Sequence, residues 1–359
     1  MSSTKPRAAY SRASPLRRRR SRSPARLSIE AAPPPLVCFP GGGTLFWWQM
    51  GAATKLLELY DCSDIVMPGY SAGALAAVLS RCAVDPELAH RCAFKLADDA
   101  GVFSNPLGLA CTWGRLVYAW LDELLPENAH QVCSGVAAVV LTRLTPWPRV
   151  ATAQHFDSRD DLIASLMAST HIPFFMDGRF SRSLADGRCA ASSTKGAAAI
   201  SAVDGGFLEF FGVATAEQLL THGARVGLRR EQPPPPAILL DALRDASFTA
   251  AMRAHGWSML NPVGTEHFME YGAAYVEEQA ALGTSGCLAP LDARLRASRA
   301  TLSESSKRTR QRLDRMRPAS TSMALQLAHG ALLLAGIAMI GIELFGLASF
   351  SPSLLRSVS

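Results

Sequence analysis

The sequence lacks several features that assign a chain to common protein classes. Its eight cysteines include no CxxC pair, and no cluster of histidine, cysteine and acidic residues has the spacing of a metal site. No internal repeat is present, and the first residues contain no apolar core of a secretory signal peptide. These absences argue against a zinc module, a repeat protein and a secreted disulfide scaffold. We therefore expect no metal, no cofactor and a reducing compartment.

Acidic residues are absent from residues 1–29, which carry nine Lys or Arg and are rich in Ser and Pro. This composition predicts disorder. Its role is open among a solvated tail, an organelle transit segment, a phosphorylatable nuclear or RNA-contacting tract, and a contact with anionic lipid. Residues 30–304, in contrast, hold 20 basic and 28 acidic residues. An acidic body argues against a nucleic-acid groove, so we expect no nucleic-acid partner.

Short apolar runs alternate with longer helical segments from residue 36 to residue 169. The pattern predicts strands at 36–39, 65–68, 136–142 and 149–153, and helices at 46–60, 72–82, 86–100, 116–125 and 158–169. Such alternation is typical of βαβ units, and it predicts an α/β fold with a mostly parallel sheet. Ser158 and Asp161 form a predicted capping box for the last helix. We expect a flexible insertion at 177–199.

Three consecutive glycines lie between the first strand and the first helix, in the stretch LVCFPGGGTLFWWQM. Glycine loses the most conformational entropy on folding, so Gly41, Gly42 and Gly43 indicate a need for positive φ or for close approach to the backbone. The next helix directs unpaired N–H groups at this loop. We expect the loop to face a negative charge, either a phosphate or an oxyanion. The apolar residues at 46–50 are interpreted as core, with an acyl-chain pocket as the alternative.

A G-x-S-x-G motif, Gly69-Tyr70-Ser71-Ala72-Gly73, follows a predicted strand and precedes an Ala-rich helix. This is the context of a nucleophile elbow, in which Gly69 and Gly73 permit a sharp turn that exposes the Ser71 hydroxyl. The earlier glycine loop offers the backbone N–H donors that a tetrahedral oxyanion requires. The two motifs together predict acyl transfer with Ser71 as nucleophile.

A serine nucleophile needs a base, and the stretch AISAVDGGFLEFFG supplies a carboxylate at a predicted strand end. The two glycines after Asp204, Gly205 and Gly206, allow close approach to another backbone. A tight turn is the alternative interpretation of this Asp-Gly sequence.

Histidine bases are the second possibility. His255 and His267 follow Asp241 and Asp245 in the Ser, Asp, His order of an α/β-hydrolase triad, although no catalytic loop pattern surrounds them. His171, in THIPFF, is interpreted as a packed or capping residue rather than a catalytic one.

Four segments, in this order, resemble the patatin-like phospholipase family, and most of all its branch that contains adipose triglyceride lipase. They are FPGGGTLFWWQMGA, GYSAG, SRDDLIASLMASTHIPFF and VDGG, and the resemblance covers about residues 36–228, continuing weakly to about 282. It implies a three-layer α/β/α fold and a Ser71–Asp204 dyad without histidine. It also implies that Gly41, Gly42 and Gly43 form the oxyanion hole.

The chain departs from the family pattern in two places. Many patatins have Arg-Gly after the glycine loop, where this chain has Thr44-Leu45; the lipase branch also tends to lack that arginine. The insertion at 177–199 is unlike compact family members. It makes the approach of Asp204 to Ser71 a point for the structure to decide.

A long apolar segment occupies residues 330–350, interrupted by Glu343. Its 21 residues match the length needed to cross a bilayer at about 1.5 Å per residue. The basic residues from Lys307 to Arg317 precede it, as is typical of the cytoplasmic side of a membrane span. We predict a membrane anchor here, with a buried core helix and an interfacial or hairpin insertion as alternatives.

These observations divide the chain into five predicted parts. They are a disordered basic tail or transit segment at 1–33, a patatin-like catalytic domain at 34–290, a basic linker at 291–322, an anchoring helix at 323–350 and a tail at 351–359. We expect a lipid acyl-ester hydrolase, of phospholipase or triacylglycerol lipase type, at a membrane or lipid-droplet surface. Its catalytic domain is expected on the cytosolic side, with a plastid or mitochondrial location left open. The alternative is a catalytically silent lipid-binding or scaffold protein with the same fold.

Overall fold

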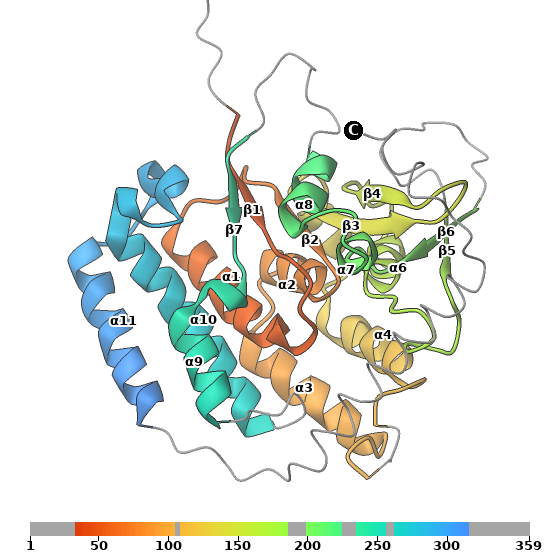
Figure 1. Cartoon of the computed structure of the whole chain (residues 1–359), viewed down its shortest axis with the longest axis horizontal. Helices are drawn as coiled ribbons and strands as arrows, with labels where there is room; N and C mark the ends of the chain where they lie inside the picture. Colours follow the sequence, from red (N-terminus) through yellow and green to blue (C-terminus); the bar gives the residue numbers. More distant parts are fainter. Residues whose placement is uncertain (1–32, 105–107, 186–198, 225–234, 256–261, 316–359) are drawn as a thin grey trace, which may run out of the picture. The chain divides into compact units, whose positions relative to one another are not determined.

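A computed structural model describes residues 33–104, 108–185, 199–224, 235–255 and 262–315 (Figure 1). The predicted basic tail and the predicted anchor at 323–350 lie outside the described residues. So does most of the predicted insertion at 177–199, of which residues 186–198 are not described.

The strands are β1 (Leu36–Cys38), β2 (Met67–Tyr70), β3 (Ala137–Arg143), β4 (Arg149–Ala153), β5 (Arg182–Ala185), β6 (Ala199–Val203) and β7 (Ala237–Leu239). Five of the strands lie close to predicted apolar runs, whereas β7 was not predicted and β5 forms within residues 177–199, which were wrongly predicted to be a flexible insertion throughout. The second strand begins two residues later than predicted, so that it runs directly into Ser71.

The helices surround this sheet. The α-helices are α1 (Phe46–Leu59), α2 (Ala72–Arg81), α3 (Pro86–Asp99), α4 (Trp113–Leu124), α5 (Ala129–Cys133), α6 (Arg159–Ser169), α7 (Phe207–Phe210), α8 (Ala216–Ala224), α9 (Ala246–His255), α10 (Pro262–Leu282) and α11 (Arg299–Asp314). Short 3₁₀ helices are η1 (Gly43–Leu45), η3 (Ala242–Arg244), η4 (Gly283–Ser285) and η5 (Ala289–Arg294). The predicted N-cap of α6 is confirmed, because Ser158 Oγ accepts a hydrogen bond from Asp161 N at 3.1 Å.

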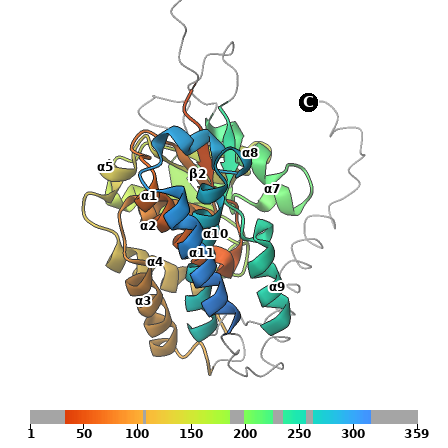
Figure 2. The same ribbon diagram turned by 90° about the vertical axis from the view of Figure 1, so that its left-hand side faces the viewer.

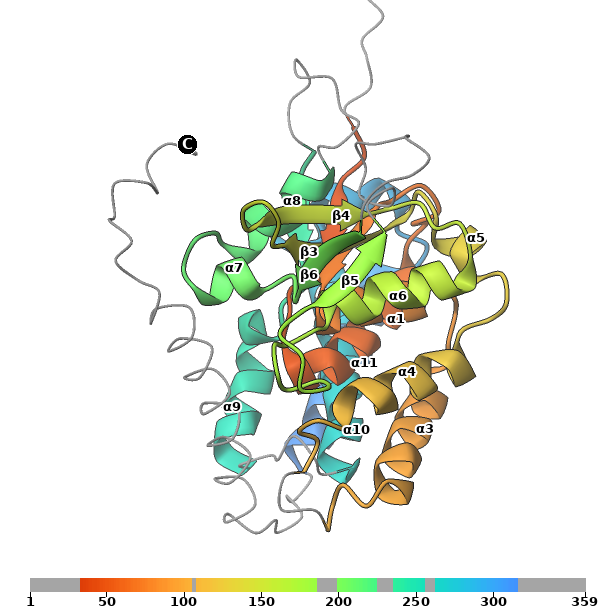
Figure 3. The ribbon, with the colours of Figure 1, turned by 90° about the vertical axis from the view of Figure 1, so that its right-hand side faces the viewer.

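The strands that carry the glycine loop and Ser71 are parallel. β1 pairs with β7, β2 pairs with β3, and Phe39 at the end of β1 forms a parallel bridge with Gly69 of β2. The other edge is antiparallel, because β4 and β6 pair with β3, and β5 pairs with β6 (Figure 3). The five-residue connection from β3 to β4 is too short for the crossover that parallel pairing needs.

Helices cover both faces of the sheet. Side chains of a strand alternate between its two faces, and here Val37 and Val139 point into a large cluster with α1, α2, α4 and α10. Leu36 and Val140 point the other way, into a smaller cluster with α7 and α8. The chain therefore forms the expected three-layer α/β/α arrangement.

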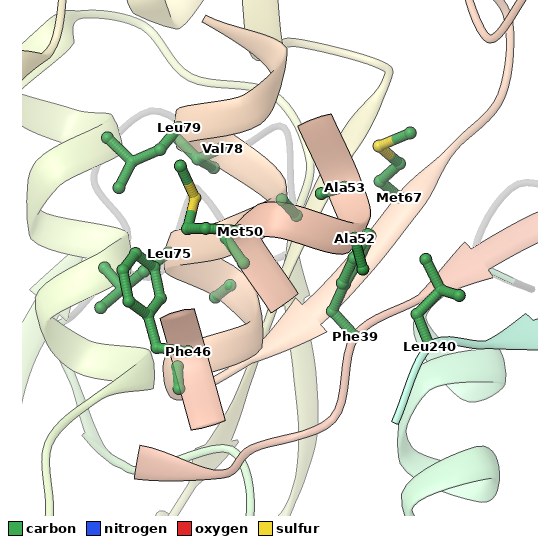
Figure 4. Packing of buried hydrophobic residues seen from close by; sticks show 14 of the residues in the cluster. Phe39, Phe46, Met50, Ala52, Ala53, Met67, Leu75, Val78, Leu79 and Leu240 are labelled. Carbon is green, nitrogen blue, oxygen red and sulfur yellow. The ribbon is translucent and has the colours of Figure 1, made fainter. Parts of the chain in front are cut away.

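Helix α1 lies in the centre of the larger cluster. Figure 4 shows Phe46 and Met50 of α1 beside Leu75, Val78 and Leu79 of α2. The apolar residues at 46–50 are buried in this cluster, as expected of core residues. Burial of this kind contributes about 25 cal/mol for each Å² of apolar surface removed from water. This burial holds in place helix α1, which follows the glycine loop, and helix α2, which begins after Ser71.

Part of the predicted basic linker is a folded helix. Helix α11 packs along α10 (Figure 2), and Arg310 Nη2 lies 3.0 Å from Oδ2 of the buried Asp245. Trp48 Nε1 donates a hydrogen bond to the same carboxylate at 3.1 Å. Breaking one side of such a buried pair typically costs about 3–5 kcal/mol. We expected these charges to face a membrane, but that of Arg310 is used to hold α11 on the protein body.

Among the described residues, no helix has both the length and the apolar character needed to span a bilayer.

Candidate active site

Ser71 lies at a sharp turn between β2 and α2. Its φ is 53°, a value that non-glycine residues rarely adopt, and such strain is commonly found at functional sites. The flanking glycines are required by close packing. A β-carbon at Gly69 would lie 2.4 Å from Gly73 O, and one at Gly73 would lie 2.1 Å from Phe39 O. The local structure is therefore the elbow that the motif predicts, with Ser71 at the N-terminus of α2.

The glycine loop lies against this elbow. A β-carbon at Gly41 would lie 3.3 Å from Ser71 Cβ, and Gly43 has a φ of 57°, which favours glycine. Within the described part of the chain, no acceptor is paired with the N–H of Gly42. An unpaired backbone donor in a loop that lies against the serine is what an oxyanion hole requires.

Asp204 follows β6 and lies close to Ser71. Its Oδ1 accepts a hydrogen bond from Gly206 N at 2.8 Å, while its Oδ2 is buried and has no hydrogen-bond partner among the described residues. Burial raises the pKa of Asp204 to about 6, although the nearby Ser71 side chain and the Gly206 N–H lower it; the negative charge of Glu209 raises it further. The carboxylate is thus a stronger base than an exposed aspartate and remains ionised at neutral pH.

Ser169, at the end of α6, connects the elbow with the aspartate turn. Its hydroxyl accepts a hydrogen bond from Ser71 N at 3.0 Å and donates one to Val140 O at 2.6 Å. Its backbone carbonyl accepts from Gly205 N at 3.1 Å. The buried Ser169 therefore holds the backbone at Ser71 and at Gly205, next to the two proposed reacting side chains.

His171 belongs to the supporting structure. Its Nε2 lies 3.1 Å from Arg179 O, and burial lowers the pKa of the imidazole. Its backbone carbonyl, rather than its ring, accepts a hydrogen bond from Asp204 N at 2.9 Å. This geometry agrees with a packed histidine.

The histidine triad gains no support from the geometry. Asp245 is engaged by Trp48 and Arg310, and Asp241 Oδ1 accepts a hydrogen bond from Leu243 N at 2.9 Å. His267 is on α10, and the side chain of His255 lies outside the described residues. None of the described contacts of Ser71 or Asp204 involves an imidazole. In the same part of the chain, no group of three or more histidine, cysteine or acidic side chains is arranged to hold a metal.

The sequence comparison decides the family. The family described as patatin-like phospholipase matches residues 37–216, a range that contains the glycine loop, the elbow and the aspartate turn. The chain belongs to the patatin-like phospholipase family. The three-layer architecture described above is therefore a patatin fold.

Curated relatives of this patatin-like chain are enzymes of lipid metabolism by name. Human omega-hydroxyceramide transacylase is 30% identical over 146 residues, which cover 40% of this chain and 27% of that protein. Mouse 1-acylglycerol-3-phosphate O-acyltransferase Pnpla3 is 31% identical over 147 residues, covering 39% and 34%. Human patatin-like phospholipase domain-containing protein 2 is 28% identical over 143 residues, covering 39% and 28%. The matched region thus spans about a quarter to a third of these relatives.

Three residues of the site were not identified from the sequence. Ser169 lies within the segment ASTHIPFF, which carried the family resemblance, but its two hydrogen bonds join positions far apart in the chain. Tyr70 is the variable residue of the G-x-S-x-G motif, and Glu209 lies five residues after Asp204. Tyr70 and Glu209 are 139 positions apart, so no sequence pattern near either residue indicates that they pair.

Proposed function

We propose that this protein cleaves carboxylic ester bonds of lipids, with Ser71 as nucleophile and Asp204 as general base. The observation that carries the proposal is the strained serine beside a buried carboxylate whose Oδ2 has no hydrogen-bond partner among the described residues. Family membership supports the same chemistry. No histidine is required, because the raised pKa of Asp204 makes it a better proton acceptor than an ordinary carboxylate.

In the first half-reaction, Ser71 Oγ attacks the ester carbonyl carbon and its proton passes to Asp204. Negative charge then develops on the carbonyl oxygen, where the N–H groups of Gly42 and Gly43 are proposed to stabilise it; the N–H of Gly41, the remaining glycine of the loop, is directed at the Tyr70 hydroxyl. The positive end of α2 adds to this stabilisation. Collapse of the tetrahedral intermediate expels the alcohol, which takes the proton from Asp204, and the acyl group remains on Ser71.

In the second half-reaction, Asp204 deprotonates an acceptor that attacks the acyl ester of Ser71; the bond between the acyl group and Ser71 Oγ then breaks, and Ser71 Oγ takes the proton back from Asp204. With water as acceptor the product is a free fatty acid, which is the reaction we propose as principal. An alcohol acceptor would transfer the acyl group instead. Two of the relatives are named as a transacylase and an acyltransferase, so the choice of acceptor is a specific point to measure.

A lipid surface is the proposed location of the substrate. Helix α7 follows the Asp204 turn directly, and Phe210 at its end and Val213 shortly after it are each 56% exposed. Exposed apolar side chains next to a reactive site are typical of contact with lipid. We propose attachment of the protein to the cytosolic side of a membrane or to a lipid droplet, helped by the apolar segment at 323–350.

A substrate panel on the purified full-length chain tests the proposal. Release of fatty acid from phospholipid, triacylglycerol and a soluble p-nitrophenyl ester is measured, with and without an added alcohol acceptor. We expect Ser71→Ala and Asp204→Asn to remove nearly all turnover. Ser63→Ala and Asp98→Asn change the same residue types at exposed positions and should retain it.

An alkyl fluorophosphonate provides a readout that does not depend on lipid. It should label wild-type protein at Ser71 and leave Ser71→Ala unlabelled. Full turnover by folded Ser71→Ala would refute the assignment of the nucleophile. A wild-type chain that is inert to every substrate and to the probe would instead favour the scaffold alternative.

A further inference from the structure

Tyr70, the residue before the proposed nucleophile, fills the space between the glycine loop and the aspartate turn. It is 1% exposed. A β-carbon at Gly41 would lie 2.7 Å from Tyr70 Cε2, and one at Gly206 would lie 3.0 Å from the same atom. A β-carbon at Gly205 would lie 2.4 Å from Tyr70 Cβ. One aromatic side chain therefore contacts both segments that are proposed to act on Ser71.

The Tyr70 hydroxyl joins these segments electrostatically as well. It donates a hydrogen bond to a carboxylate oxygen of Glu209 on α7. Burial and Glu209 raise the pKa of Tyr70, and the backbone N–H of Gly41, which acts on the same hydroxyl oxygen, lowers it by less. The hydroxyl thus connects Gly41 on one side with Glu209 on the other. Among the described contacts, no hydrogen bond joins the glycine loop directly to the Asp204 turn.

We propose that Tyr70 and Glu209 are positioning residues that hold the oxyanion loop and the catalytic aspartate in register around Ser71. The inference rests on the proposed function. The glycine loop and the aspartate turn are about 160 positions apart in sequence and approach Ser71 from different strands, so their relative placement depends on tertiary contacts. A misplacement of about 1 Å at a reacting centre can cost about a hundredfold in rate.

Glu209 has a second effect, on the proton acceptor. It is the charged group that acts on the Asp204 carboxylate, which also interacts with the Ser71 side chain and the Gly206 N–H. The Tyr70 hydrogen bond holds the Glu209 carboxylate toward the site, although α7 exposes this residue to solvent. Removing the negative charge of Glu209 should therefore make Asp204 lose its proton at lower pH.

The test compares Tyr70→Phe and Glu209→Gln in the full-length chain, using the soluble p-nitrophenyl ester. Tyr70→Phe keeps the ring but loses the hydroxyl, and we expect kcat to fall about tenfold or more with KM within about twofold. That is the usual effect of losing a hydrogen bond to a charged group. Glu209→Gln keeps an acceptor for the hydroxyl, so kcat should fall about threefold or less. The acidic limb of the pH profile of kcat for Glu209→Gln should move to lower pH.

Matched controls and a double variant separate positioning from general packing. Tyr118→Phe and Glu87→Gln alter exposed residues of the same types on α4 and α3, and both should match wild type. Above the acidic limb of the pH profile, the double variant of Tyr70 and Glu209 should be no slower than Tyr70→Phe alone, because without the hydroxyl the side chain at position 209 has no hydrogen bond to Tyr70 left to lose. Thermal unfolding and the rate of fluorophosphonate labelling are measured for each protein.

Four results would decide against these proposals. A folded Tyr70→Phe with wild-type kcat, or an unshifted acidic limb in Glu209→Gln, would overturn the inference and leave only packing. If Tyr70→Phe does not fold, Glu209→Leu removes the acceptor at an exposed position, and wild-type kcat in that variant would equally overturn it. Absence of Ser71-dependent turnover in the wild type would be a failure of the proposed function, which the Ser71→Ala control reveals separately.

Discussion

Asp204→Asn should abolish ester turnover and at the same time raise the stability of the protein at neutral pH. The carboxylate is held in a buried site that disfavours its charge, and this is what makes it a useful base. Asparagine has nearly the same shape, and its Oδ1 can still accept the hydrogen bond from Gly206. Activity and stability are therefore expected to respond to this change in opposite directions.

The magnitude follows from the two protonation equilibria of Asp204. Below pH 3.8 the carboxyl group is protonated in the folded and the unfolded chain. Between pH 3.8 and about 6 the unfolded chain releases this proton while the native protein retains it, so native stability falls as the pH rises. Above pH 6 the loss is complete. The difference between the ordinary pKa of 3.8 and about 6 corresponds to about 3 kcal/mol.

Urea unfolding, followed by tryptophan fluorescence at a series of pH values, measures this directly. The stability of Asp204→Asn minus that of wild type should increase by about 2 kcal/mol between pH 4 and pH 7.5, because part of the total of about 3 kcal/mol falls below pH 4. Any new cost from the asparagine N–H₂ group is the same at every pH and does not alter this change. Asp98→Asn, at an exposed site, serves as the control. A stability difference that stays constant with pH, or an acidic limb of wild-type turnover centred near pH 4, would contradict the reasoning.

Four further outcomes are expected. Gly42→Val should lower kcat by about a hundredfold, because losing an oxyanion donor removes about 3 kcal/mol of transition-state stabilisation; near-normal turnover would show that the glycine loop is only a structural turn. A chain ending at Ser322 should leave the membrane fraction after a carbonate wash yet hydrolyse the soluble ester; full-length protein in the supernatant would refute the anchor. His171→Ala, if folded, should retain turnover; if turnover were lost, a mechanism with a histidine base would have to be reconsidered. Phe210→Ser should lower the ratio of bilayer-lipid to soluble-ester turnover, while Leu282→Ser, a similarly exposed apolar position, should not.

Local sequence patterns were sufficient to predict most elements from β1 to α6, but few of those that follow. The predicted helix at 86–100 is α3, Pro86–Asp99, and the predicted strand at 149–153 is β4. The motifs around Ser71 and Gly43 were also readable, because a strained turn and a positive φ restrict the residue types at single positions. Hydrophobic period and backbone conformation depend on neighbours in sequence, so they can be recognised without the structure.

Partners that meet across the fold could not be predicted in this way. Arg310 belongs to a stretch whose composition indicates a solvated basic linker, but the structure buries it against Asp245. The hydrogen bonds of Ser169 and the Tyr70–Glu209 pair are equally invisible in the sequence. Even the raised pKa of Asp204 arises from burial by distant segments rather than from its neighbours in the chain. The residue types of the site follow from local chemistry, whereas their electrostatic environment exists only when the separate strands and helices pack together.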